Sequence, residues 1–331
     1  MKTKELLSKL EAVKTAVATS GSDETAKSFL ISDKHLYAYS ERCFCSVPLD
    51  TDLDLQVNAK VLFEFVKKLK GEDVELLNED GSLRVKSGRN RVLIPAEEKV
   101  KIPSNLVDIG EEFELPHSFG ENVVNAGFSV GNDPTRPYLN IVKVVEDQIY
   151  STDNHKITRI EMDHDISDVL NIPQYAIKNI GIINPTHYSI SGGWLVFENV
   201  GSEVVFCCRT VDAEKFPNLD GIFGRTMEWN NIEFPDGMND SIERAIVFAK
   251  HAQKNQQTVR VKSDGDNITV IAKSPVGEYS DEMPFEGCTF DFVTNAKSLL
   301  DLLKRRPSVA ISGNIMKLEN GTETHLISLG R

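Results

Sequence analysis

The chain contains three copies of one helix–strand–turn–strand pattern, and this internal repeat limits its fold more than any other feature of the sequence. The copies begin at Asn58, Pro173 and Asn295, so successive copies start 115 and 122 residues apart. A further candidate helix precedes each copy, over residues 4–19, 118–128 and 241–254. We therefore expect an α+β protein of three similar domains, each with two helices packed on antiparallel sheets, at residues 1–110, 111–224 and 225–331.

The strand segments support this interpretation. Apolar and polar residues alternate over residues 258–262 and 268–271, as they do in a strand with one buried face. Asp80-Gly81 and Asn320-Gly321 are typical of tight turns between two strands.

Composition predicts a soluble protein of the cytoplasm. The sequence has 331 residues, of which 40% are hydrophobic, and no stretch approaches the run of about 18 apolar residues that crosses a membrane. Its five cysteines lack the C-x₂-C spacing of a zinc site, and their apolar neighbours predict buried thiols in a reducing compartment. We expect no metal and no cofactor. These cysteines are Cys43, Cys45, Cys207, Cys208 and Cys288.

The charge distribution favours loose contact with a polyanion. A formal net charge of −13 argues against a protein that coats nucleic acid by bulk attraction. Lysine-rich helix faces are also common on ordinary solvated surfaces, but several of them on an acidic chain indicate a locally positive surface. The basic residues expected on these faces are Lys60, Lys67, Lys68, Arg244, Lys254, Lys297, Lys304 and Arg305.

No catalytic motif is present. The sequence contains no phosphate-binding loop, no H-E-x-x-H zinc motif and no G-x-S-x-G nucleophile motif. Asp153 and His155, with His164, offer a carboxylate and imidazoles, but the strand-like residues 156–162 between them disfavour a compact metal site. The same residues also suit a polar turn between two strands.

Residues 128–162 resemble the middle domain of the bacterial DNA polymerase III β subunit, the sliding clamp. The family pattern T-R-P-x-L-N is matched by "TRPYLN" at residues 135–140, and A-T-D-G-H-R-L is matched by "STDNHKI" at residues 151–157. The segment "SGRNR" at residues 87–91 and "VDAEKFPNLDGIF" at residues 211–223 match two further family segments. With the threefold repeat, the resemblance covers the whole chain and implies a DNA-clamp fold and a role without catalysis.

The resemblance implies a hydrophobic cleft that receives peptide tails of the DNA polymerase and the clamp loader. In the family, the turn carrying Thr-Asp-Gly-His-Arg borders this cleft. Carried over position by position, its lining would be Leu139, Thr152, Asn154, His155, Lys156, Ile157, Pro217, Ile222, Ile327 and Leu329.

The resemblance also implies a ring around double-stranded DNA, built from two chains joined head to tail. In the family, an edge strand of the first domain pairs with the third domain of the next subunit. Here that strand would contribute Arg89, Arg91, Val92 and Ile94, opposite acids such as Glu278, Asp281 and Glu282. Contacts with DNA would be weak because the ring holds it topologically.

Two departures from the family pattern bear on partner choice. Asn154 replaces a glycine of the turn, and Gly221 stands where the family usually has an arginine beside the cleft. We interpret them as marks of a divergent clamp of phage origin with altered partner specificity. Two other functions remain open, a clamp-fold adaptor that does not encircle DNA and a metal-dependent nuclease using Asp153, His155 and His164.

Overall fold

The computed structural model of the chain describes residues 1–18, 25–98, 110–253, 257–305 and 307–330. It divides into two compact units. Unit 1 comprises Met1–Gly127, Ile141–Glu146 and Asp163–Asp212, and unit 2 comprises Phe128–Asn140, Asp147–Met162 and Ala213–Arg331. Division into three domains at residues 110 and 224 stays a prediction.

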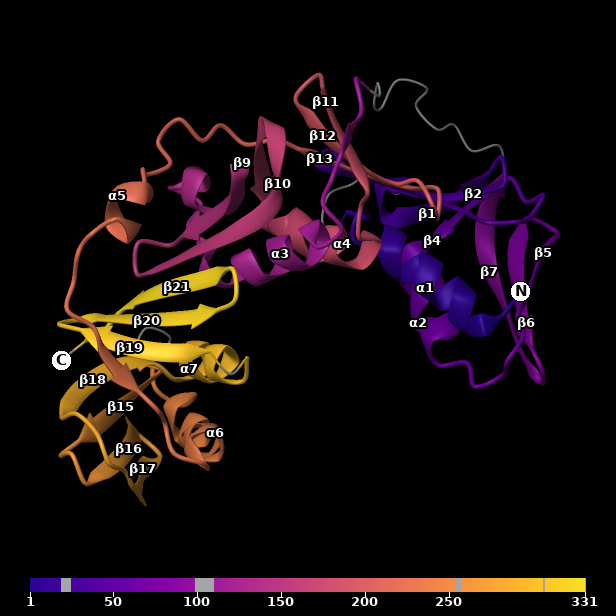
Figure 1. Ribbon diagram of the computed structural model, residues 1–331. Coiled ribbons are helices and arrows are strands. Elements are labelled where there is room, and N and C mark those ends of the chain that lie inside the picture. The colour runs from indigo at the N-terminus through magenta and orange to yellow at the C-terminus, as the bar shows by residue number, and fades with distance from the viewer. Residues whose placement is uncertain (19–24, 99–109, 254–256, 306, 331) are drawn as a thin grey trace. The chain divides into compact units, whose positions relative to one another are not determined.

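The helices expected from the repeat are present, and they pack against one another in pairs. Within the described residues α1 packs against α2 and α3 against α4 in unit 1, and α6 packs against α7 in unit 2 (Figure 1). The structure ends the first predicted helix earlier, at Lys14, and starts α6 earlier, at Met238. Their bounds are α1 Thr3–Lys14, α2 Ala59–Lys67, α3 Phe119–Ala126, α4 Gln174–Ile183, α6 Met238–Ala249 and α7 Ala296–Leu303.

Two of the repeated helices start with the same device. The side-chain oxygen of Asn58 accepts a hydrogen bond from the N–H of Val61 at 3.0 Å, and Asn295 accepts one from Ser298 at 2.9 Å. An asparagine at this position satisfies one of the free N–H groups of the first helical turn. The matching "NAK" triplets therefore encode matching helix starts.

Unit 1 is built on one antiparallel sheet. Among the described residues its strand order is β5-β6-β7-β4-β1-β2-β3-β13-β12-β11-β8. The strands are β1 Ser28–Ser32, β2 His35–Tyr39, β3 Cys43–Pro48, β4 Leu55–Asn58, β5 Glu75–Glu79, β6 Ser82–Ser87, β7 Asn90–Glu98, β8 Phe113–Glu114, β11 His187–Ser191, β12 Trp194–Asn199 and β13 Val204–Arg209. A short 3₁₀ helix, η1, spans Thr25–Lys27. The pairing of β3 with β13 joins a strand that precedes the first copy of the repeat to the last strand of the second copy.

Unit 2 contains two antiparallel sheets, with strand orders β14-β19-β20-β21-β10-β9 and β17-β16-β15-β18. The two longest strands, β9 Ile141–Thr152 and β10 Lys156–Pro173, contribute residues to both units. The others are β14 Asn230–Ile232, β15 Thr258–Ser263, β16 Asn267–Ser274, β17 Gly277–Pro284, β18 Phe290–Asn295, β19 Ser308–Ser312, β20 Ile315–Asn320 and β21 Glu323–Ser328. Short helices lie at η2 Gly127–Ser129, η3 Pro137–Leu139 and α5 Asp220–Phe223.

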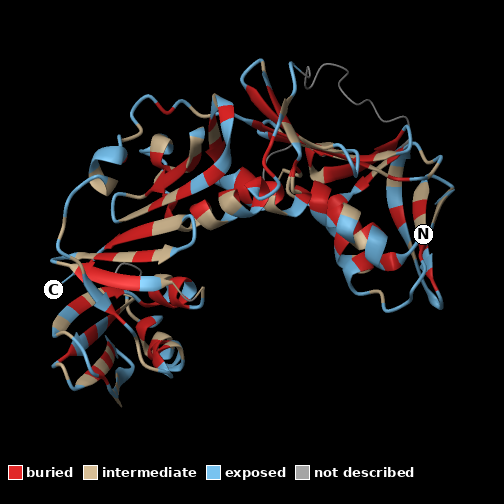
Figure 2. Cartoon of the chain, in the orientation of Figure 1, coloured by how far each residue is buried: buried red, intermediate tan, exposed pale blue. Residues whose placement is uncertain are grey.

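The cores follow the predicted periodicities. Buried residues alternate with exposed ones along β15 and form a stripe on α7, where Leu299 and Leu302 are buried (Figure 2). The turn at Asp80-Gly81 has positive φ at both residues, +46° and +72°, as an Asp-Gly hairpin turn requires. No helix in the described residues is long and apolar enough to cross a membrane.

Candidate functional site

The segment "STDNHKIT" forms a tight turn between β9 and β10. The N–H groups of His155 and Lys156 each donate to Oδ1 of Asp153 at 2.8 Å, and Thr152 Oγ1 donates to the carbonyl of Lys156 at 2.8 Å. Asn154 takes a left-handed conformation with φ +75°, which asparagine tolerates better than most residues. The carboxylate of Asp153 therefore shapes the turn, while the His155 side chain is exposed.

The "TRPYLN" motif is a loop closed by its own hydrogen bonds. Asp133 accepts from the N–H and hydroxyl of Thr135 at 2.9 and 2.7 Å and from Arg136 Nε at 2.8 Å. Those bonds, from Thr135 first and Arg136 next, lower the pKa of Asp133 to about 2. Asn140 closes the loop from its other end by donating to the carbonyl of Asp133 at 2.8 Å. The loop buries Leu139 within unit 2.

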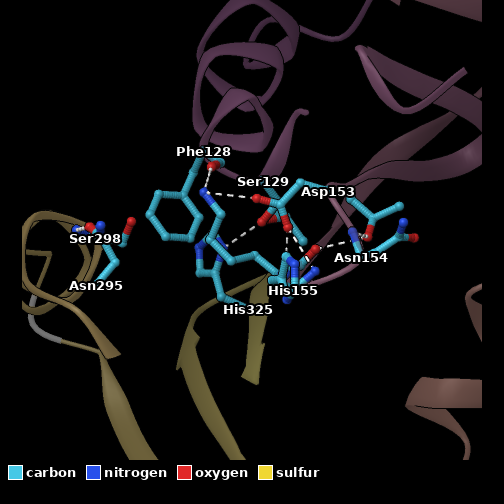
Figure 3. Close-up of polar contacts among 11 residues, drawn as sticks. Phe128, Ser129, Asp153, Asn154, His155, Asn295, Ser298 and His325 are labelled. Atoms are coloured by element: carbon cyan, nitrogen blue, oxygen red, sulfur yellow. Dashed lines mark hydrogen bonds and ion pairs between the residues drawn. The ribbon is translucent and has the colours of Figure 1, made fainter. Parts of the chain in front are cut away.

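A buried polar network stabilises the pairing of β10 with β21 (Figure 3). Ser129 Oγ lies 2.7 Å from Thr158 Oγ1, which lies 2.8 Å from Nδ1 of His325. All three side chains are at most 2% exposed. The Phe128 ring meets the His325 ring edge to face, with centroids 5.5 Å apart. Because an unpaired buried polar group is costly, this network specifies which residues of the two strands stand opposite each other.

The strand register creates a cleft on the opposite face of this sheet. Ile157 stands directly opposite Leu326, and side chains two residues apart on a strand share a face. Arg159 and Leu326, with Ile222, line a hollow of about 100 Å³. Two aromatic residues also line it, and each lies under a cation: Phe223 is 4.6 Å from the guanidinium of Arg159, and Trp229 is 5.0 Å from Lys317 Nζ.

The chain leading out of β13 covers this hollow and is held in place by a hydrogen bond. The phenol of Tyr150 donates to the carboxylate of Asp220, at the start of α5. Pro217 and Ile222 on this segment are half-buried, which suits residues at the border of a cleft. Ile222 lines the hollow, and Ile157 lies on the same face of β10 as Arg159, which also lines it. The role of Ile157 and Ile222 in a partner cleft stays a prediction.

The assignment of Lys156, Ile327 and Leu329 to the cleft is wrong. Lys156 Nζ donates to the carbonyl of Phe128 at 2.8 Å and lies 4.5 Å from its ring centroid, on the network side of the sheet. Ile327 and Leu329 belong to the buried core that includes α6 and α7. In this register Lys156 stands opposite Ile327, and the side chains of both point to the face of the sheet opposite to that of Ile157. On β21, Leu326 and Thr324 line the hollow.

The predicted DNA-facing residues divide into free and paired cations. Lys60, Lys67, Lys68 and Lys297 are exposed and form no ion pair with another described residue. Arg244, however, donates to Asp281 at 2.8 Å, Lys304 to Glu243 at 2.5 Å and Arg305 to Glu323 at 3.3 Å. Lys254 lies outside the described residues. Positive charge available to a polyanion is therefore concentrated on α2, with Lys297 on α7.

Within the part of the chain that the structure describes, strands β7 and β17 each have an unpaired stretch along one edge. Among the described residues, β7 pairs with β6 over residues 90–95 but with β4 only over residues 96–98, and β17 pairs with β16 alone. Arg89 and Arg91 are exposed and Val92 is half-buried, as an edge contact requires. Ile94 is only 2% exposed within its own unit, so its predicted role as a subunit contact is wrong. Leu93, 57% exposed, is the apolar side chain that this edge presents.

No described residues form a metal site at the turn, and His155 and His164 are separated along the extended strand β10. Asp153 already accepts two main-chain hydrogen bonds. The geometry therefore gives no support to the nuclease hypothesis, which needed these three side chains together.

We predict that Thr158→Val destabilises unit 2 by about 2 kcal/mol, because it leaves Ser129 and His325 buried without their shared partner. Urea denaturation measures the change. Thr324→Val is the matched control: Thr324 lies on the adjacent strand, half-buried on the cleft side, and we expect its effect to stay within about 0.5 kcal/mol. Equal effects of the two substitutions would contradict a structural role for the network.

Comparison with known proteins identifies the fold. No protein-family model matches the sequence, and no curated protein matches it. Solved structures do match over the full length of the chain. The DNA polymerase III β subunit of Thermotoga maritima is 19% identical with a TM-score of 0.78, over 100% of this chain and 98% of that one.

Two further structures agree. The DNA polymerase sliding clamp of Bacillus subtilis is 18% identical with a TM-score of 0.74, over 100% and 98% of the two chains. The DNA polymerase III β subunit of Pseudomonas aeruginosa is 16% identical with a TM-score of 0.74, over 100% and 99%. An origin in a phage stays a prediction. The chain has the α+β clamp fold of the DNA polymerase III β subunit over its whole length.

Proposed function

We propose that this protein is a DNA sliding clamp, a cytoplasmic processivity factor that encircles double-stranded DNA and tethers a replicative polymerase. The observation that carries the proposal is the full-length match to the clamp fold. A hollow lined by residues of β21 and of β10, the strand that follows the turn, supports it. The role needs no catalytic group. A tethered polymerase stays at high local concentration beside its template, which is the physical source of processivity.

The cleft is the proposed site for tails of the polymerase and the clamp loader. Its lining combines apolar Ile222, Phe223 and Leu326 with the cations Arg159 and Lys317. An apolar anchor of a partner peptide would fill the hollow, while polar groups at its border satisfy the peptide backbone.

The proposed DNA contact is weak and salt-dependent. Free lysines on α2 attract phosphates, whereas the overall charge of −13 discourages tight nonspecific binding. The second helix pair adds little attraction, because Lys178 is the one basic residue on α3 and α4 and Glu121 is exposed beside it. Loose contact permits sliding when the ring itself prevents escape.

Ring closure in this proposal joins β7 of one chain to β17 of another, in a head-to-tail homodimer. Both strands have an unpaired edge among the described residues. An exposed edge is a liability unless a partner covers it. Arg89 and Arg91 would face Glu282, while Glu278 and Asp281 are engaged with Lys273 and Arg244. Because few acidic residues of β17 remain available to pair with these arginines across the interface, we expect a dimer that dissociates at low concentration.

We predict that Ile157→Glu weakens capture of a labelled polymerase tail peptide at least tenfold, because the carboxylate must be buried beside the apolar anchor. Fluorescence anisotropy with the folded variant measures the affinity. Ile190→Glu, at a half-exposed isoleucine of β11 in unit 1, is the control and should bind normally. Unchanged affinity of the Ile157 variant would overturn the cleft assignment.

We predict that the double variant Lys67→Glu, Lys68→Glu shortens retention on nicked circular DNA. Each lost phosphate contact lowers the slope of log affinity against log salt by about 0.9, so the slope should fall by about 1.8. A variant with Lys34→Glu and Lys262→Glu carries the same charge change at exposed sites that do not belong to α2. If both variants behave alike, α2 is not the surface that meets DNA.

We predict that Leu93→Glu raises the dissociation constant of the dimer about tenfold, because it places a charge at an apolar edge contact. Sedimentation velocity over a concentration series measures it, with Val169→Glu as an exposed control on β10. A wild-type protein that stays monomeric at high concentration would refute the closed dimer and favour the adaptor.

A further inference from the structure

Four buried cysteines gather where β3 pairs with β13. In this register Cys43 stands directly opposite Cys208, whereas Cys45 faces Phe206 and Cys207 faces Phe44. Each of the four cysteines is at most 4% exposed, and all are free thiols. Only one of these cross-strand pairs therefore places sulfur opposite sulfur.

The hydrogen-bond pattern shows that Cys43 and Cys208 form a non-hydrogen-bonded pair, the type in which the two Cα atoms are closer together. The N–H of Arg209 donates to the carbonyl of Arg42 at 3.0 Å, so Arg42 and Arg209 are hydrogen-bonded across the strands. The next pair, Cys43 and Cys208, is then a non-hydrogen-bonded pair. The main-chain groups of Cys43 support this conclusion. Its N–H donates to Ser40 Oγ and its carbonyl accepts from the N–H of Ser40, so both groups point away from β13.

The backbone geometry permits a disulfide bond between Cys43 and Cys208. Non-hydrogen-bonded pairs in antiparallel sheets have Cα atoms about 4.5 Å apart, within the range of roughly 4.4 to 6.8 Å that disulfides span. The alternatives fit less well. Cys43 and Cys45 lie along one strand with parallel side chains about 6.6 Å apart, and Cys207 and Cys208 point to opposite faces of the sheet.

We propose that Cys43 and Cys208 are a modification site, a dithiol that a low-molecular-weight disulfide converts reversibly to a cross-strand disulfide. One cysteine thiolate attacks the small disulfide, forms a mixed disulfide and releases one small thiol. The second cysteine then attacks the mixed disulfide and releases the other. Two protein thiols are oxidised and one small disulfide is reduced to two thiols, so electrons and protons balance.

The bond would fasten β3, which precedes the first copy of the repeat, to β13, the last strand of the second copy. It closes a long loop between residues 43 and 208, and long loops gain most from a cross-link in the entropic account. The inference does not rest on a role in replication.

The position of the pair at the strand end provides access. β3 begins at Cys43, next to the exposed residues Glu41 and Arg42, so fraying of this end uncovers the thiols. Burial raises the pKa of the Cys43 thiol to about 12, and burial also raises the pKa of the Cys208 thiol well above its ordinary value. Because the thiolate is the attacking form, oxidation is slow at neutral pH and should accelerate about tenfold per pH unit below that pKa.

The test treats the purified full-length chain with oxidised glutathione under native conditions, followed by peptide mass spectrometry without reduction. Trypsin leaves Cys43 with Cys45 in one peptide and Cys207 with Cys208 in another, so the assignment uses the Cys45→Ala, Cys207→Ala variant. We expect an intramolecular cross-link of Cys43 to Cys208, reversed by dithiothreitol. The midpoint of thermal unfolding of the oxidised form should rise by about 10 °C.

Matched variants make the result decisive. Cys43→Ser and Cys208→Ser should each abolish the cross-link and the shift in midpoint. Half-buried Cys288 reports that the oxidant is active. Should the double alanine variant fail to fold, chymotrypsin cuts the wild-type chain after Phe44, between Cys43 and Cys45, and fragmentation in the mass spectrometer between Cys207 and Cys208 assigns the other end of the link. The proposal is overturned if Cys43 and Cys208 stay reduced while Cys288 is modified, if Cys45 or Cys207 supplies the link, or if only unfolded protein forms it.

Discussion

The antiparallel pairing of β10 with β21 is the contact on which the candidate site depends. It joins residues 156–160 to residues 323–327, more than 160 positions away in the chain. One face of this pairing closes over the buried network of Ser129, Thr158 and His325. The other face carries Ile157 opposite Leu326, and Leu326 lines the hollow together with Ile222 and Phe223. The same hydrogen-bonded ladder therefore provides both the stability of unit 2 and the shape of the cleft.

Electrostatics divide the surface in a way that suits a loosely held polyanion. Carboxylates neutralise Arg244, Lys304 and Arg305 in unit 2, while the lysines of α2 in unit 1 stay unpaired among the described residues. Exposed ion pairs of this kind contribute little to stability, so their main effect is to lower the local positive potential. Attraction to DNA would thus come from few positions, which agrees with topological rather than tight binding.

Much of the fold could be predicted from sequence because its signals are local. The repeated asparagines at 58 and 295 cap helices, and Asp80-Gly81 makes a hairpin turn, each through contacts within three residues. The cleft was predicted only in part. In "LIS" at residues 326–328 two apolar residues are adjacent, so alternation alone does not show which one faces the core. In the run Val92-Leu93-Ile94 the wrong apolar residue was assigned to the exposed edge for the same reason. The ion pair of Arg244 with Asp281 could not be predicted, because it depends on a contact between α6 and β17 that is distant in the sequence.

The central claim is that the protein holds DNA by surrounding it, and release upon linearisation tests this most directly. In this test a clamp loader places the chain on a nicked circular duplex, the complex is isolated by gel filtration, and the circle is then cut with a restriction enzyme. The account predicts stable retention on the circle and rapid loss from the linear product, because the ring slides off the free ends. Equal retention on circular and linear DNA would contradict topological binding, and absence from both would leave the clamp fold with an adaptor function.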